Sequence, residues 1–187
     1  MKRIAMWMAL GLIFTLSAEG WAGSKKDKDK DKETTEKATS SESSEKGKAF
    51  DDWTMKCGRP EENGPELCLL AHAVFRKDAK EPSLIVRLNY QQSTKITLLS
   101  AIVPLGVDLA AGVSLKADDG FPTNLALRYC TPAGCEAFLP LDGSTLKAIS
   151  GAKKIVIGWL PVGAKEPLIV PVSTKGLKAG LEALQKS

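Results

Sequence analysis

The feature that most constrains the fold of this chain is an even set of cysteines behind an export signal. The cysteines are Cys57, Cys68, Cys130 and Cys135. Outside the cytosol such thiols become oxidised, so the chain is predicted to carry two disulfides. Sequence alone does not choose among the three pairings that these cysteines allow. Because each neighbouring pair brackets a turn-rich segment, the local bonds Cys57–Cys68 and Cys130–Cys135 are favoured. Each would contribute about 2–3 kcal/mol on the chain-entropy argument.

Metal and redox chemistry are the alternatives for these cysteines. A zinc site favours C-x-x-C pairs and a thioredoxin-like centre requires one, whereas the gaps here are ten and four residues. The alternation of Asp27, Asp29 and Asp31 is similar to the start of a calcium loop, but the glycine and the distal glutamate of such a loop are missing. No metal ligand and no cofactor are therefore predicted.

Residues 1–22 have the parts of a secretory signal: a basic start, an apolar run over residues 4–16, and small residues before the cut. The mature chain is expected to begin near Gly23, and a cut after Ala18 is the alternative. The apolar run has about 13 residues, against the roughly 20 that a membrane-spanning helix needs. No transmembrane span is therefore expected after cleavage.

Residues 23–48 are predicted to form a disordered mixed-charge tether, because they lack the apolar side chains that would offset the entropy of ordering. Eight lysines face seven acids there, so no excess of one charge selects a membrane surface or a nucleic acid. Residues 49–187 carry 16 basic and 14 acidic side chains. This balance selects no class of partner, and no nucleic-acid partner is expected.

The domain over residues 49–187 is predicted to be mostly β. Short apolar runs alternate with Pro, Gly, Asn and Asp, which is typical of strands and turns. The predicted strands are 53–57, 67–75, 84–88, 96–103, 113–115, 125–129, 137–141, 155–159 and 168–172. The run over 67–75 is apolar on both faces, as in a central strand of a sandwich. The pattern predicts an antiparallel β-sandwich with short helices.

Two helices are predicted, one near residues 144–149 and one from about Thr174 to the C-terminus. The second has leucines at i, i+4 and i+7, with Ser173 or Thr174 as its N-cap. These leucines are Leu177, Leu181 and Leu184. Gly176 and Gly180 weaken this helix by roughly 1 kcal/mol each relative to alanine. The helix must therefore be held by docking its leucine face.

The residues of common catalytic sites are mostly missing. The one histidine, His72, shares a strand face with Leu70 and Val74, which favours a core or cross-strand role over that of a base. No G-x-S-x-G, H-E-x-x-H or P-loop motif occurs. No catalytic residue is therefore predicted.

Paired acids and strand aromatics are the remaining candidates. The acid pairs are Asp51 with Asp52, Glu61 with Glu62, and Asp118 with Asp119. Adjacent acids on a strand point to opposite faces, and on a turn they face water, so solvated turn residues are favoured over a catalytic pair. The aromatics Trp53, Trp159, Phe138 and Tyr129 can line a ligand groove, but aromatics on strands are more often core. The ligand-binding residues stay unassigned.

Several motifs in order resemble a known family. They are the segment FDDWTMKC from Phe50 to Cys57, the segments PLGV at 104–107 and GV at 112–113, YCTPAGCEA over 129–137, and PVS at 171–173 leading to Gly176 and Leu177. Together, behind an export signal, they resemble the invasion-associated locus B proteins of Gram-negative bacteria. The resemblance runs from Phe50 to about Leu184. That family usually has glycine where Asp51 stands, a departure that affects a turn.

The resemblance implies an exported envelope protein in the periplasm, at the outer membrane or on the cell surface, from a family linked to host-cell entry. It implies no enzyme and supplies no catalytic residues. The expected function is binding of a protein or envelope component through a sheet edge or a loop end. The alternatives are a periplasmic assembly or chaperone module and an envelope hydrolase.

Overall fold

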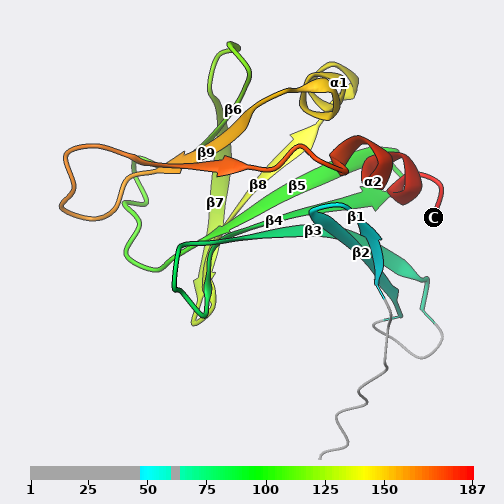
Figure 1. The fold of residues 1–187 in the computed structure, drawn as a ribbon, viewed down its shortest axis with the longest axis horizontal. Helices are drawn as coiled ribbons and strands as arrows, with labels where there is room; N and C mark the ends of the chain where they lie inside the picture. Colours follow the sequence, from blue (N-terminus) through cyan, green and yellow to red (C-terminus); the bar gives the residue numbers. More distant parts are fainter. Residues whose placement is uncertain (1–46, 60–63) are drawn as a thin grey trace, which may run out of the picture. The chain divides into compact units, whose positions relative to one another are not determined.

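The computed structural model of this chain describes residues 47–59 and 64–187. These residues form ten strands and two helices (Figure 1). The strands are β1 (Lys48–Phe50), β2 (Trp53–Gly58), β3 (Leu67–Phe75), β4 (Pro82–Gln91), β5 (Ile96–Val103), β6 (Val113–Ala117), β7 (Thr123–Thr131), β8 (Gly134–Leu141), β9 (Ile155–Trp159) and β10 (Leu168–Val172). The helices are α1 (Gly143–Gly151) and α2 (Leu177–Leu184). The predicted export signal, nearly all of the predicted tether and the pair Glu61–Glu62 lie outside the described residues.

The mostly β, antiparallel architecture is confirmed. All nine predicted strands are present as β2 to β10, and β3, β5, β9 and β10 have the predicted bounds. The additional strand is β1, which pairs with β2 through a two-residue turn. Asp51 in that turn has a positive φ of 48°, a conformation that suits glycine best. This explains why glycine is the expected residue at this position.

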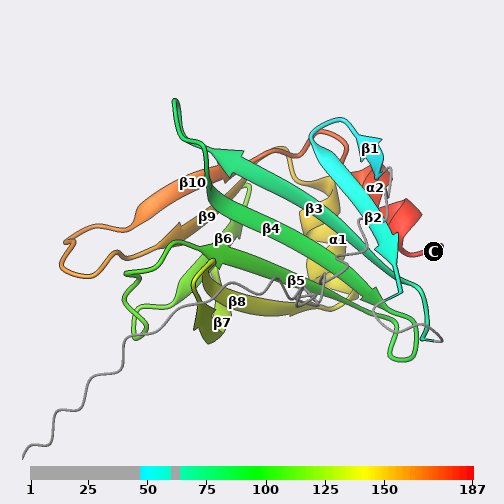
Figure 2. The ribbon, with the colours of Figure 1, turned by 90° about the horizontal axis from the view of Figure 1, so that it is seen from below.

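The strands form one continuous sheet in the order β1-β2-β3-β4-β5-β8-β7-β6-β9-β10. Every pairing is antiparallel. The sheet curls, so that β9 and β10 lie across the core from β3 and β4 (Figures 1 and 2). The two layers of the predicted sandwich are therefore two halves of one sheet. At one end the halves meet where Trp53 Nε1 donates a hydrogen bond of 2.9 Å to the Ser173 carbonyl.

The core fills the space inside the curled sheet and beneath the helices. Its largest fully buried side chains include Trp53, Leu70, Leu84, Leu88, Leu99, Ile157, Leu177 and Leu184. The leucine face of α2 is buried, as its spacing predicts. Gly180 lets α2 approach β3 closely, because a Cβ atom there would lie 2.7 Å from a methyl group of Leu70. Among the described residues, neither helix is long and apolar enough to cross a membrane.

The predicted N-cap of α2 is wrong. The helix begins after Gly176, which has a left-handed φ of 81° and caps with no side-chain hydrogen bond. A Cβ atom on Gly176 would lie 1.9 Å from the Phe50 carbonyl oxygen, so only glycine fits between α2 and β1. Ser173, one of the expected caps, instead accepts a hydrogen bond from the Lys175 backbone N–H at 3.2 Å.

Both disulfides join neighbouring strands. Cys57–Cys68 links β2 to β3 with the Cα atoms 4.0 Å apart, and Cys130–Cys135 links β7 to β8 at 3.9 Å. In each pair the two cysteines face each other directly in the strand register. These are the same local pairs that the spacing favours.

Candidate binding surface

His72 has a packing role in the structure. Its ring centroid lies 5.3 Å from that of Trp53, and its Nδ1 atom is 2.7 Å from the Asp52 carbonyl oxygen. The side chain is half-buried on the inner side of β3. It therefore joins β3 to the β1–β2 turn rather than facing an open cleft.

The four aromatic candidates do not line one groove. Trp53 and Trp159 are core residues. Tyr129 and Phe138 instead lie on the opposite side of the sheet, with ring centroids 6.0 Å apart, and Tyr129 is 52% exposed. Two of the four residues thus belong to the core and two to a surface.

The described acid pairs serve the turns that carry them. Asp52 accepts a hydrogen bond from the Ser173 hydroxyl. Asp118 Oδ1 accepts backbone N–H bonds from Lys153 at 3.0 Å and Lys154 at 2.8 Å. Within residues 47–59 and 64–187, no group of three or more His, Cys, Asp or Glu side chains is placed to hold a metal ion. One member of each described pair, Asp52 and Asp118, therefore makes a structural contact.

The most distinctive surface is the outer side of β3, β4, β5 and β8, which we call the outer face. Figure 2 looks onto it, with these strands in front and α1 behind them. The burial alternation and the strand register assign its side chains. They are Leu67, Leu69, Ala71, Ala73 and Phe75 on β3, Ile85, Arg87 and Asn89 on β4, Ile96, Leu98, Ser100 and Ile102 on β5, and Glu136, Phe138 and Pro140 on β8.

The outer face is unusually apolar. An antiparallel sheet with one face on the core is commonly polar on the other face. Here the outer face carries aliphatic and aromatic side chains, and its charges on these four strands are Arg87 and Glu136. Leu67 and Phe75 are 49% and 55% exposed. The run over 67–75 is therefore not buried on both faces as expected, because its second apolar side faces solvent.

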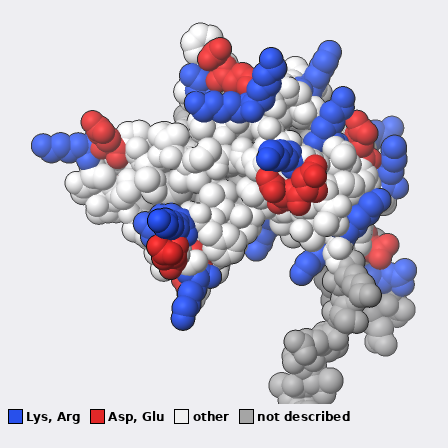
Figure 3. Space-filling model, viewed as in Figure 1, with Lys and Arg blue, Asp and Glu red and all other residues white. Residues whose placement is uncertain are grey.

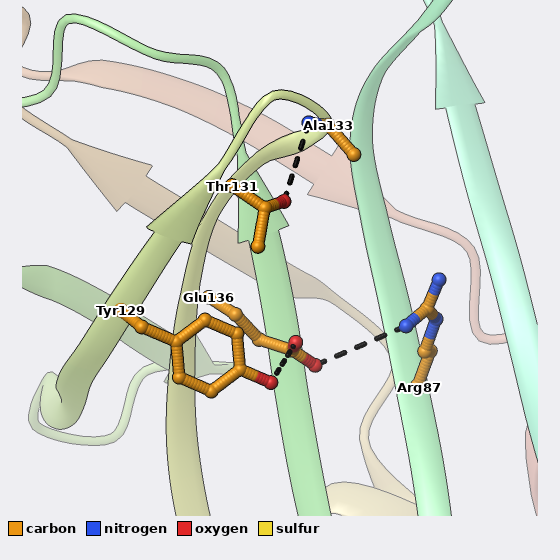
Figure 4. A network of polar contacts seen from close by, with 5 residues as sticks. All are labelled: Arg87, Tyr129, Thr131, Ala133 and Glu136. Atoms are coloured by element: carbon orange, nitrogen blue, oxygen red, sulfur yellow. Dashed lines mark hydrogen bonds and ion pairs between the residues drawn. The ribbon is translucent and has the colours of Figure 1, made fainter.

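One polar network crosses the outer face (Figure 4). Arg87 Nη1 lies 4.0 Å from Glu136 Oε1, the one ion pair among the described residues. The Tyr129 hydroxyl donates a 2.8 Å hydrogen bond to Glu136 Oε2. This hydrogen bond, together with desolvation and the nearby negative charge, raises the pKa of Tyr129. The network ties β4, β8 and β7 together, and it leaves the face close to electrically neutral.

A groove of about 500 Å³ extends from the outer face, with which it shares Ile85 and Ile102, along the end of the sheet. The rest of its lining is mostly apolar, with Pro82, Pro104, Leu105 and Pro132, and it contains one carboxylate, that of Glu81. The β7–β8 turn forms one wall, and it is braced by an Ala133 N–H bond of 3.2 Å to Thr131 Oγ1. Gly134 lets this turn approach β5, because a Cβ atom there would lie 2.5 Å from the Val103 carbonyl.

The outer face combines an apolar surface with one polar network, that of Arg87, Tyr129 and Glu136. Its signal in the sequence is the apolar run over 67–75, whose outward positions are as apolar as its inward ones. The same pattern is typical of a central strand that is buried on both faces. The network of Arg87, Tyr129 and Glu136 has no signal in the sequence, since these residues meet only through the strand order.

Comparison with known proteins identifies a matching family and several relatives. The model of the family described as "Invasion associated locus B (IalB) protein" matches residues 53–185. Two curated invasion protein B homologs of Brucella abortus, from strain 2308 and from biovar 1 strain 9-941, are each 26% identical over 136 residues. The alignments cover 73% of this chain and 77% of each relative.

A solved structure has the same fold. The crystal structure of invasion associated protein B from Bartonella henselae aligns with a TM-score of 0.66 and 20% sequence identity. The alignment covers 74% of this chain and 93% of that chain. The family model, the curated relatives and the shared fold agree with one another, and the chain belongs to the invasion-associated locus B family.

Proposed function

We propose that this chain is an exported, non-enzymatic envelope protein that binds a protein partner through its outer face. The observation that carries the proposal is the solvent-facing row of apolar side chains on β3, β4, β5 and β8. Contiguous exposed apolar surface on a soluble domain commonly marks an interaction site. A partner with an apolar centre and little net charge would match this face.

The composition of the outer face favours a protein over a small ligand. The face is broad, and the groove beside it is shallow and continuous with it. Tyr129 and Arg87 are of the types that dominate binding energy in protein interfaces. Arg87 lies 4.0 Å from Glu136, so the two opposite charges offset each other and favour a partner with little net charge.

The sheet edges support binding less well than the face does. β1 has three residues and packs against α2, and β10 has five residues that include Pro171. Proline has no N–H to donate to an added strand, and short or proline-bearing edges resist strand addition. An assembly or chaperone module would be expected to have a long, unpaired apolar strand at a sheet edge. Neither described edge strand, β1 or β10, is of this kind.

The disulfides and the named relatives support a compartment and a role. Two disulfides support export to an oxidising compartment, and we place the protein in the periplasm, at the outer membrane or on the cell surface. The curated Brucella relatives are named invasion protein B homologs, which supports a contribution to host-cell interaction. The structural use of Asp52 and Asp118 in turns supports binding over an envelope hydrolase.

Site-specific photo-crosslinking in the producing bacterium, in the presence and absence of host cells, tests the proposal. A photoreactive residue at Ala73 or Ile102 should yield a discrete adduct, because both positions lie on the outer face. The same residue at Lys178, exposed on α2, should not yield that adduct. The Ile85→Asp variant should abolish the adduct from Ala73, because Ile85 lies directly opposite Ala73 in the strand register and a carboxylate there would be costly to desolvate beneath a bound partner.

The matched control for Ile85→Asp is Val162→Asp. Val162 is 71% exposed and lies outside the outer face, so this variant should crosslink as the wild type does. Equal adducts from Lys178 and Ala73, or an adduct from Ala73 that survives Ile85→Asp, would exclude the outer face as the binding surface. Protease treatment of intact cells would then assign the compartment by whether the domain is digested before the outer membrane is breached.

A further inference from the structure

The connection between β6 and β7, residues 118–122, presents a single large aromatic side chain to solvent. Phe121 is 96% exposed, the highest value among the exposed large hydrophobic residues of the described chain. Its neighbours along the connection are Asp119, Gly120 and Pro122. Phe121 therefore protrudes alone, and it does not belong to the outer face.

This tip is held in place by hydrogen bonds. The Asp118 backbone N–H donates to the Lys154 carbonyl at 2.8 Å, and Asp118 Oδ1 accepts from the backbone N–H groups of Lys153 and Lys154. The Gly120 N–H closes the turn on the Ala117 carbonyl at 3.1 Å. The exposure of Phe121 is thus built into a turn that is bonded to the start of β9.

Three lysines surround an open cleft beside the tip. Lys116, Lys153 and Lys154 line it together with Asp118 and Asp119, and its volume is about 540 Å³. None of these lysines forms an ion pair with any described residue, and the Asp118 carboxylate is engaged by backbone N–H groups. Figure 3 shows basic and acidic side chains gathered at this end of the molecule, at the top of the view. The three lysines outnumber the two carboxylates of the cleft, so the cleft has a net positive charge next to the exposed ring.

We infer that this tip docks the protein on an anionic lipid bilayer, with Phe121 at the level of the headgroups and the three lysines facing lipid phosphates. An aromatic ring is stabilised at a membrane interface, and nearby lysines add attraction to anionic lipid. A protein partner is a poorer match, because a lone ring without an apolar surround buries far less than the roughly 800 Å² per partner of a stable interface. The inference is independent of the outer face and of what binds there.

Co-sedimentation of the exported, purified protein with vesicles tests the inference. Binding to phosphatidylglycerol vesicles at low salt should exceed binding to phosphatidylcholine vesicles. The Lys153→Gln, Lys154→Gln double variant should bind phosphatidylglycerol roughly 25-fold more weakly, because each lysine near an anionic surface contributes about 1 kcal/mol, a factor of about five. Phe121→Ser should weaken binding at least fivefold. Phe121 and both lysines are exposed, so these variants should fold normally.

Matched control variants distinguish binding through this tip from non-specific adsorption to the vesicles. Leu109→Ser removes another exposed large apolar side chain, outside both the tip and the outer face, and Lys165→Gln with Lys178→Gln removes two exposed lysines outside the cleft. Both controls should bind as the wild type does. Equal binding to the two vesicle types, equal loss in Leu109→Ser and Phe121→Ser, or full displacement by millimolar glycerol phosphate would overturn docking on a bilayer.

Discussion

The contact between Gly176 and β1 makes a sharp test of how α2 is held. Gly176 has a φ of 81°, and a Cβ atom on it would overlap the Phe50 carbonyl oxygen. Replacing Gly176 with alanine therefore adds two separate penalties, one from the backbone conformation and one from the contact. Neither penalty is visible in the helix propensity of alanine, which on its own predicts a more stable α2.

The size of the effect can be estimated from these two terms. A left-handed conformation costs an alanine about 1–2 kcal/mol, and inserting an atom into a filled space costs about 1–3 kcal/mol. Lower entropy of the unfolded chain returns about 0.4–1 kcal/mol. Gly176→Ala should therefore lower the free energy of unfolding by about 2–4 kcal/mol, a large part of the 5–15 kcal/mol typical of a domain.

Two other glycines separate the cost of the backbone conformation from the cost of the steric contact. Gly163 has a φ of 79° with no atom near its Cβ position, and Gly143 has open space and no positive φ. Gly163→Ala should cost about 1 kcal/mol from the backbone alone, and Gly143→Ala in α1 should be neutral or stabilising. Urea unfolding followed by tryptophan fluorescence gives the three free energies. If Gly176→Ala lost no more stability than Gly163→Ala, the argument for a tight contact with Phe50 would be refuted.

Three further predictions concern charges and staples. Hydrogen bonds from the backbone N–H and the hydroxyl group in the first turn of α1 lower the pKa of Asp142 to about 2. The stability that this cap provides should be fully present above about pH 4 and lost as the pH falls towards 2, so a thermal melt of Asp142→Ala should depend less on pH in that window than the wild type does. Glu136→Gln should move the raised pKa of Tyr129 back towards 10, measured by ultraviolet titration, and an unchanged titration would remove Glu136 as the cause. The Cys57→Ala, Cys68→Ala double variant opens a loop with a sequence separation of 11 and should lose about 3 kcal/mol in urea unfolding. A loss below about 1 kcal/mol would show that the pairing of β2 with β3 needs no staple.

Most of the strand pattern could be predicted, because the strands alternate or run apolar between strong turn residues. β1 could not be predicted, since its residues Lys48, Ala49 and Phe50 carry no alternation. It is a strand only because the turn at Asp51 folds it onto β2. Short edge strands of this kind depend on a partner rather than on their own side chains.

The start of α2 and the outer face could not be predicted from local sequence patterns, because both depend on contacts between distant parts of the chain. The leucine spacing predicted which face of α2 packs on the core. The residue at which α2 begins depends on the contact of Gly176 with Phe50, which lies near the start of the domain sequence. The pattern over 67–75 predicts apolar side chains on both faces of the strand. It does not indicate whether the second face is covered by another part of the chain. The contact of Arg87 with Glu136 requires the order β4-β5-β8, and no local signal encodes that crossover.

The contact between β2 and the segment before α2 also implies that the core closes late in folding. Trp53 bonds to the Ser173 carbonyl across a separation of 120 residues, so the core closes through a loop that spans nearly the whole domain. Closing long loops carries an entropic cost that must be met before their contacts form, which slows folding. A chain still missing its last helix leaves Leu70 and Trp53 uncovered. The core is therefore expected to close only after the final segment of the chain is present.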